Sequence, residues 1–414
     1  MAAAPTTGAP PRRDASPADG TLPDAARAEI PCRALGVYVH VPWCASRCGY
    51  CDFNTYVPDE GALPSLGRRF AEAADAELAL AATVLRPPPG GQRPPVATVF
   101  LGGGTPSLLA PEAIARVLRA VDDRLGVAPG VEVTCECNPE SVDPARLAAL
   151  REAGVTRVSF GMQSARAHVL ASLERRHSPG RAVAAAAEAR AAGFDAVGLD
   201  LIYGADGEGD EDWRASLAAA IAAEPDSVSA YALTIEPGTR YAAMVRRGAR
   251  RPTDEDALGR RYALADRLLT AAGYAAYELS NWARTPAGVC RHNVGYWRGE
   301  HWWGVGPGAH SHVGGVRWSN VLRPEAWMAR LEEGRSPAAA REVLDPEQRR
   351  LEALMTGIRI PEGADRGLLD DAGAVRAAEL VADGHLVAGA WDAGRIVLAP
   401  AARPLADAVL RRIT

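Results

Sequence analysis

Tyr38-Val39-His40-Val41-Pro42-Trp43-Cys44-Ala45-Ser46-Arg47-Cys48-Gly49-Tyr50-Cys51-Asp52-Phe53 is the stretch of this chain that says most about its fold and chemistry. It begins as a valine-rich strand and continues into three cysteines at the spacing Cys-x-x-x-Cys-x-x-Cys. Thiolates are the soft ligands that iron–sulfur clusters use, and closing loops this short costs little chain entropy. An ordinary 4Fe–4S cluster takes four thiolates. We therefore predict a 4Fe–4S cluster on Cys44, Cys48 and Cys51, with one iron left open for an outside ligand.

A structural zinc site is one alternative explanation of these cysteines. It would need a fourth ligand, which His40 could supply. Such sites usually add a second, distant pair of ligands, and no such pair is obvious here. Cys135 and Cys137 sit on a predicted strand as packing residues, and Cys290 stands alone. Three packing cysteines brought together by chance are the other alternative.

Short β-rich runs alternate with helical stretches from residue 35 to about residue 233. The predicted strands are 36–41, 97–101, 131–137, 157–161, 196–203 and 227–233, and the helices between and after them are 64–85, 111–125, 144–153, 166–173, 181–192 and 210–223. Six β-then-α units in a row imply a parallel sheet with right-handed crossovers. Eight units close a full barrel, so we predict an α/β fold built on a partial (β/α)6 barrel. A doubly wound sheet is the alternative.

Composition also predicts where the domains begin and end, and it argues against nucleic acid and membranes as partners. We expect a disordered lead-in over 1–30, the barrel over 31–240, an extension rich in aromatic residues over 241–344, and a small α+β domain over 345–414. The net charge of −5 provides no basic field for nucleic acid. No apolar run reaches the roughly 18 residues of a transmembrane helix. Seven cysteines, an odd number with one tight group, suit the reducing cytoplasm.

Polar residues recur on one face of the predicted strands, opposite the valines and leucines. In barrels of parallel strands, functional groups collect at the carboxyl ends of the strands. The second strand ends in the turn Gly102-Gly103-Gly104-Thr105, whose glycines let the backbone approach a ligand closely. The residues predicted to share the interior face are Tyr38, His40, Thr134, Glu136, Ser159, Gln163 and Asp200.

These features resemble the radical S-adenosylmethionine superfamily, and within it the branch of oxygen-independent coproporphyrinogen oxidase and its HemW-type haem chaperone relatives. The matching stretches are 38–53, 102–107, 136–140, 159–164 and 200–204. The resemblance implies that the open iron binds an exchangeable S-adenosylmethionine. The residues it places around that cofactor are Tyr38, Tyr50, Gly103, Gly104, Thr105, Glu136, Gln163, Arg175 and Asp200. Arg176, beside Arg175, is an alternative for the arginine.

Three features favour the haem chaperone over the oxidase within this branch. Phe53 stands where the oxidase motif has a fourth cysteine, and the lead-in is short for the oxidase. The stretch 291–297, Arg-His-Asn-Val-Gly-Tyr-Trp, matches the His-Asn-x-x-Tyr-Trp signature of the chaperones. The resemblance therefore implies haem as cargo, an acceptor protein that receives it, and a reductant for the cluster. A radical methylase is a third class that shares the first half of the chain, and a homodimer is left open.

Histidine is a standard axial ligand of haem, and aromatic side chains suit a flat macrocycle. We expect His292 to be the haem ligand, with Tyr296 and Trp297 as walls of the site. His310, His312 and Cys290 are the alternative ligands. A purely structural role for His292, as a hydrogen-bonding residue, is also open.

Overall fold

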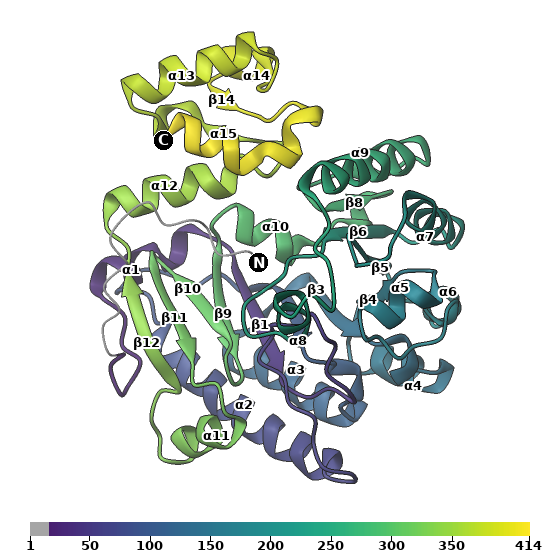
Figure 1. Ribbon diagram of the computed structural model, residues 1–414. Coiled ribbons are helices and arrows are strands. Elements are labelled where there is room, and N and C mark those ends of the chain that lie inside the picture. The colour runs from purple at the N-terminus through teal and green to yellow at the C-terminus, as the bar shows by residue number, and fades with distance from the viewer. Residues whose placement is uncertain (1–15) are drawn as a thin grey trace.

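The computed structural model describes residues 16–414, and a 12-stranded sheet runs through most of it (Figure 1). The strand order is β12-β11-β10-β9-β1-β2-β3-β4-β5-β6-β8-β7. The strands are β1 (Leu35–Val41), β2 (Val96–Gly103), β3 (Val127–Cys137), β4 (Arg157–Gln163), β5 (Ala196–Tyr203), β6 (Ser227–Ala232), β7 (Ala275–Ala276), β8 (Asn281–Ala283), β9 (His301–Val305), β10 (His310–Val313), β11 (Val316–Asn320) and β12 (Ala338–Val343).

The helices that lie between β1 and β6 confirm the predicted alternation, with ends shifted by at most one residue. They are α2 (Leu63–Val84), α3 (Pro111–Leu125), α4 (Pro144–Glu152), α5 (Ala167–Ser172), α6 (Arg181–Ala191) and α7 (Asp210–Ala222). Later helices of the sheet region are α8 (Arg240–Arg246), α9 (Glu255–Ala271), α10 (Arg291–Trp297) and α11 (Pro324–Glu332). Figure 1 shows the crossover helices ranged along one side of the strands.

Strands β1 to β6 are parallel and adjacent in sequence order. A doubly wound sheet would reverse its strand order at a switch point, and the order from β1 to β6 has no such reversal. The partial barrel is therefore confirmed. Val37, Val39 and Val41 of β1 are fully buried and pack in one core with Phe70 and Leu78 of α2. Apolar residues on the helix side leave the opposite face of each strand for polar groups.

A seventh parallel strand was not predicted. Strand β9 pairs parallel with the free edge of β1, with Tyr38 opposite Gly304. It arrives from the aromatic extension rather than from a further βα unit, so no periodic signal precedes it. Strands β10 to β12 then continue the sheet as antiparallel neighbours.

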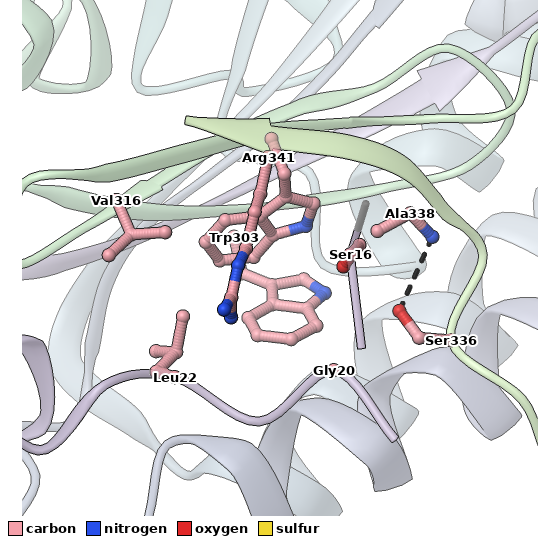
Figure 2. A pocket seen from close by; sticks show the side chains of 9 residues that line it. Ser16, Gly20, Leu22, Trp303, Val316, Ser336, Ala338 and Arg341 are labelled. Carbon is pink, nitrogen blue, oxygen red and sulfur yellow. Dashed lines mark hydrogen bonds between the residues drawn. The ribbon is translucent and has the colours of Figure 1, made fainter. Parts of the chain in front are cut away.

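The N-terminal segment differs from the predicted lead-in over part of its length. Residues 1–15 of that prediction lie outside the described residues, but 16–30 are ordered against the sheet and include α1 (Asp24–Glu29). Leu22, Ala26 and Ile30 are buried in the main core. Figure 2 shows Gly20 and Leu22 beside Trp303 of β9, near Arg341, which donates to the Thr21 carbonyl. Three apolar residues spaced four apart are enough to anchor a segment that is otherwise polar in composition.

The chain ends in a separate small core at the top of Figure 1. Its elements are α12 (Pro346–Gly357), β13 (Ala364–Asp365), α13 (Asp371–Ala382), α14 (Ala388–Asp392), β14 (Arg395–Ile396) and α15 (Ala406–Ile413). Within this core Leu386 pairs with Leu398, residues 388–392 between them form a helix, and β14 pairs with β13.

Among the helices of residues 16–414, none has both the length and the apolar character that a membrane span requires.

Candidate functional site

The cysteine loop is closed at its base by pairing between Trp43 and Tyr56. The Cys44 amide donates to the Tyr56 carbonyl at 3.0 Å, and the Tyr56 amide donates to the Pro42 carbonyl at 2.7 Å. At the far side of the loop, the Gly49 carbonyl accepts from the Tyr241 amide at 2.8 Å. Strand β1, the 54–56 segment and α8 thus hold the three cysteines in a defined loop.

The three thiols are free, with Cys44 buried and the other two half-buried. Burial raises the pKa of Cys51 to about 11 and also raises the pKa of Cys44, which the neighbouring Thr105 hydroxyl partly offsets. Bound iron would supply the positive charge that keeps such thiols ionised. The donor set is therefore suited to a metal cluster rather than to a reactive free thiol.

Zinc fits this loop poorly. Within 16–414, no group of three His, Cys, Asp or Glu side chains is gathered closely enough for one metal ion. His40, the fourth ligand considered above, has its Nδ1 at 2.9 Å from the Tyr38 hydroxyl and its Nε2 at 2.9 Å from the Asn54 carbonyl. Both nitrogens are thus engaged. The residues from 16 to 414 therefore offer these thiols no fourth ligand for zinc.

Two acidic side chains lie on the interior face beside the glycine turn. The Gly103 amide donates to Glu136 Oε2 at 3.2 Å, and the Ser159 hydroxyl lies 3.0 Å from both carboxylate oxygens of Asp200. Burial, reinforced by the negative charge of Asp200, raises the pKa of Glu136 to about 8. Burial raises the pKa of Asp200 as well. The raised pKa values mean that the two half-buried carboxyls do not ionise readily next to each other. A cationic ligand would stabilise their charged forms, so the pair is suited to bind one.

Gln163 ends β4 in a strained conformation. Its φ is 60°, the ladder to β5 shifts between Gly161 and Gln163, and its buried Oε1 has no partner among the described residues. A non-glycine residue held there costs about 1–3 kcal/mol, which is typical of ligand-binding positions. An unpartnered buried oxygen beside the acidic pair fits a polar cofactor that would complete its hydrogen bonds.

Arg175, rather than Arg176, approaches the cysteine loop. Its Nη1 lies 3.4 Å from Cys48 Sγ, and its Nη2 donates to the Gly161 carbonyl at 2.9 Å. Arg176 is exposed. Tyr50 lies close to both Arg175 and Cys48. The arginine thus joins the loop to the end of β4.

The His and Trp side chains of the His-Asn-x-x-Tyr-Trp stretch in α10 lie in two different environments. His292 is 3% exposed, with Nδ1 at 2.8 Å from Thr98 Oγ1 and Nε2 at 2.8 Å from the Tyr296 hydroxyl. Its ring stacks on Phe100, and burial lowers its pKa to about 3. Trp297 instead lies under the guanidinium of Arg359, from the C-terminal part of the chain.

This arrangement changes the expectation for His292. Both ring nitrogens are engaged with hydroxyls, so an iron could be bound only after one of these bonds had broken. The Glu132 carboxylate also accepts from the backbone amides of Arg291 and His292, which fixes the start of α10 on β3. The His292 ring thus joins α10 to β2, and its role as the haem ligand stays a prediction.

Replacing His292 by alanine is expected to lower the free energy of unfolding by about 3 kcal/mol, because it leaves a cavity and removes the partner of two buried hydroxyls. Urea denaturation of the metal-free chain measures this loss. His168→Ala is the matched control, because that histidine is exposed and its ion-pair partner among residues 16–414 is Asp212, at 3.2 Å. Its effect should stay within about 0.5 kcal/mol. Equal stability of the two variants would contradict a structural role for His292.

Asn54 is a structural residue that the sequence does not reveal. Its side-chain Nδ2 donates to the Pro307 carbonyl at 3.0 Å and to the Leu322 carbonyl at 2.8 Å. These contacts tie the cysteine loop to the segments that flank β10 and β11. The partners are 253 and 268 positions away, and no local pattern connects positions so distant.

Comparisons with known proteins agree with this geometry. The model of the radical SAM superfamily matches residues 38–220. The chain is 48% identical over 388 residues to the heme chaperone HemW of Mycobacterium tuberculosis strain H37Rv, covering 93% of this chain and 96% of that protein. It is 35% identical over 368 residues to the heme chaperone HemW of Escherichia coli K12, covering 85% and 91%. Among solved structures, coproporphyrinogen III oxidase (HemN) from Escherichia coli, a radical SAM enzyme, superposes with a TM-score of 0.78 over 94% of this chain and 92% of that one, at 20% identity. At that identity the likeness concerns the fold alone.

Proposed function

The chain belongs to the HemW family of the radical SAM superfamily, and from that premise we propose that it is a haem chaperone that binds haem and passes it to an acceptor protein. The observation that carries this proposal is its 48% identity to a protein named as a heme chaperone, over nearly the full length of both. Phe53, half-exposed where the oxidase motif has a fourth cysteine, supports the chaperone over the oxidase.

In this proposal Cys44, Cys48 and Cys51 would hold a 4Fe–4S cluster, and its open iron would bind S-adenosylmethionine. When bound, this pair supplies one-electron chemistry. The residues around it bind and orient the cofactor. Glu136 and Asp200 offer carboxylates to its positive groups, and Gln163 offers an oxygen with no other partner among residues 16–414. The remaining residues proposed to contact it are Tyr38, Tyr50, Gly103, Gly104, Thr105 and Arg175.

Binding of S-adenosylmethionine is expected to tighten as the pH rises towards 8. The pKa of Glu136 is raised to about 8, so below that pH its carboxyl is mostly neutral. The cationic cofactor favours the ionised form and must displace the proton first. Affinity should therefore rise by up to about tenfold per pH unit below pH 8 and level off above it.

Isothermal titration of the cluster-loaded chain across this pH range measures the effect. Glu136→Gln should weaken binding and flatten the profile, because the amide does not titrate. Glu152→Gln, at an exposed position at the end of α4, is the matched control and should behave as the unaltered chain does. A Glu136→Gln profile that keeps the slope would assign the titration to another group.

Two assays on one preparation separate the chaperone from coproporphyrinogen III oxidase, the alternative in this branch. The cluster-loaded chain is mixed with haem and followed by absorbance spectroscopy. It is then given coproporphyrinogen, S-adenosylmethionine and a reductant. We expect haem binding without decarboxylation. Turnover of coproporphyrinogen would overturn the proposal, and so would failure to bind haem in either oxidation state.

The proposed function also implies a cellular location and two protein partners. We expect the chain to act in the cytoplasm, where free thiols stay reduced, with a reductant protein for its cluster and an acceptor for its haem. Incubation of the haem-loaded chain with a haem-free acceptor candidate, followed by separation of the two proteins, tests transfer directly.

A further inference from the structure

The His40 imidazole lies beside Tyr38 on the interior face of β1. Residues two apart on a strand point the same way, and the centroids of the two rings are 5.9 Å apart. His40 is 5% exposed. A Cβ at Gly103 would lie 2.5 Å from His40 Cε1, so the glycine turn packs directly against the imidazole. The ring is therefore enclosed between the turn and the tyrosine, and its hydrogen bonds have fixed directions.

The two hydrogen bonds of His40 determine which of its ring nitrogens carries the proton. Nε2 lies 2.9 Å from the Asn54 carbonyl oxygen, and a carbonyl oxygen can only accept, so the proton is on Nε2. Burial lowers the pKa of His40, which keeps the ring neutral with a single N–H. Nδ1 is then an acceptor. Its partner at 2.9 Å, the Tyr38 hydroxyl, must therefore be the donor.

The Tyr38 hydroxyl has one proton, and this proton is directed at His40. Burial raises the pKa of Tyr38 well above its usual value, so the phenol keeps the proton. The Phe100 ring stacks on the tyrosine ring, with their centroids 6.3 Å apart and an angle of 29° between the ring planes. Tyr38 is half-buried. Towards a bound ligand, its oxygen can therefore act only as an acceptor.

Glu136 is a second acceptor beside Tyr38. A Cβ at Gly102 would lie 3.0 Å from Glu136 Oε2 and 3.2 Å from Tyr38 Cε2, so both side chains border the same glycine. The charge of Glu136 also contributes, after burial, to the raised pKa of Tyr38. A hydroxyl proton that was not held by His40 could turn towards this carboxylate and occupy it. Two neighbouring oxygen acceptors suit a ligand that carries N–H donors and positive charge.

We propose that His40 is a positioning residue of the cofactor site, which holds the Tyr38 hydroxyl proton so that Tyr38 and Glu136 both face S-adenosylmethionine as acceptors. This inference rests on the proposed cofactor site and adds to it a residue that does not itself touch the cofactor. Without the imidazole, the hydroxyl proton would point at Glu136 or at the donors of the cofactor. In the first case it would take an acceptor from the cofactor, and in the second it would oppose binding.

Two substitutions separate the two hydrogen bonds of His40. In His40→Asn, the amide oxygen reaches the position of Nδ1 and can accept from Tyr38, but the side chain is too short for the Asn54 carbonyl. In His40→Gln, the amide nitrogen reaches the position of Nε2 and can donate to that carbonyl, but Tyr38 loses its acceptor. S-adenosylmethionine is titrated by calorimetry into the full, cluster-loaded chain under anaerobic conditions. We expect His40→Gln to weaken binding at least about tenfold and His40→Asn by less than about threefold.

A Tyr38→Phe background tests whether His40 acts through the hydroxyl. Tyr38→Phe should itself weaken binding, and His40→Gln should then add less than about twofold, because no hydroxyl proton remains to be directed. His168→Gln is the matched control, since this histidine of α5 is exposed, and it should bind the cofactor as the unaltered chain does. Circular dichroism and iron content verify that each variant is folded and loaded.

The outcomes separate this inference from the proposal it rests on. If the cluster-loaded, unaltered chain binds no S-adenosylmethionine, the proposed cofactor site fails and the role of His40 fails with it. If the unaltered chain binds the cofactor and His40→Gln keeps the same affinity, the site stands and the role of His40 is overturned. Equal losses in His40→Asn and His40→Gln, or a His40→Gln loss that adds in full to that of Tyr38→Phe, would make His40 a tether of the cysteine loop and refute the inference.

Discussion

Alanine at Cys48 is expected to abolish the cluster, reducing bound iron from about four atoms per chain to nearly none after reconstitution. The loop has three thiols, and loss of one leaves two ligands for a cluster that already has an open iron. Cys48 also lies 3.4 Å from Arg175, so the variant leaves that guanidinium without its thiol partner. Iron and sulfide analysis, together with the visible absorbance of the cluster, measures the loss under anaerobic conditions.

Cys32→Ser is the control for this result, because Cys32 is exposed and lies outside the loop. It should retain full iron content. Cys44→Ala and Cys51→Ala should behave like Cys48→Ala. A Cys48→Ala protein that retains a complete cluster would show that another residue is a ligand and would refute the three-cysteine assignment.

Alanine at Gly104 is expected to lower the free energy of unfolding by about 1–3 kcal/mol and to weaken S-adenosylmethionine binding strongly. A Cβ at this position would lie 2.6 Å from the Trp43 carbonyl oxygen and 2.8 Å from that of Val41. Both are backbone atoms of the segment that leads into Cys44. The Gly104 amide also donates to the Val41 carbonyl at 2.7 Å, so the methyl group would push the glycine turn away from β1.

Gly259→Ala is the matched control for that substitution. Gly259 lies within α9, and nothing stands within 4 Å of the Cβ it would gain. Alanine is the better helix former by up to about 1 kcal/mol, so the control should be as stable as the unaltered chain or more stable. Titration of the cofactor into both variants completes the comparison. Unchanged affinity in Gly104→Ala would remove the glycine turn from the proposed cofactor site.

The sequence alone was sufficient for the repeating part of the fold. Strands β1 to β6 and their helices follow from alternation of valine-rich runs with helical stretches, because both periodicities are local. The Cys-x-x-x-Cys-x-x-Cys spacing is also local, so the proposed ligands of the cluster could be named without coordinates. Glu136 and Asp200 could be assigned to the interior face because residues two apart on a strand point the same way.

The tertiary structure decided the features that depend on long-range pairing. Strand β9 pairs with β1, although strands β2 to β6 lie between the two in the sequence. Its own residues resemble those of the aromatic segments around it, so no local pattern marks it as a strand of the barrel. The same limit applies to His292 and His310. The sequence presents both as histidines among tryptophans, but folding engages both nitrogens of one between Thr98 and Tyr296 and brings the other to the surface. Whether a side chain is enclosed or exposed depends on which distant segments pack over it, and no local pattern records that choice.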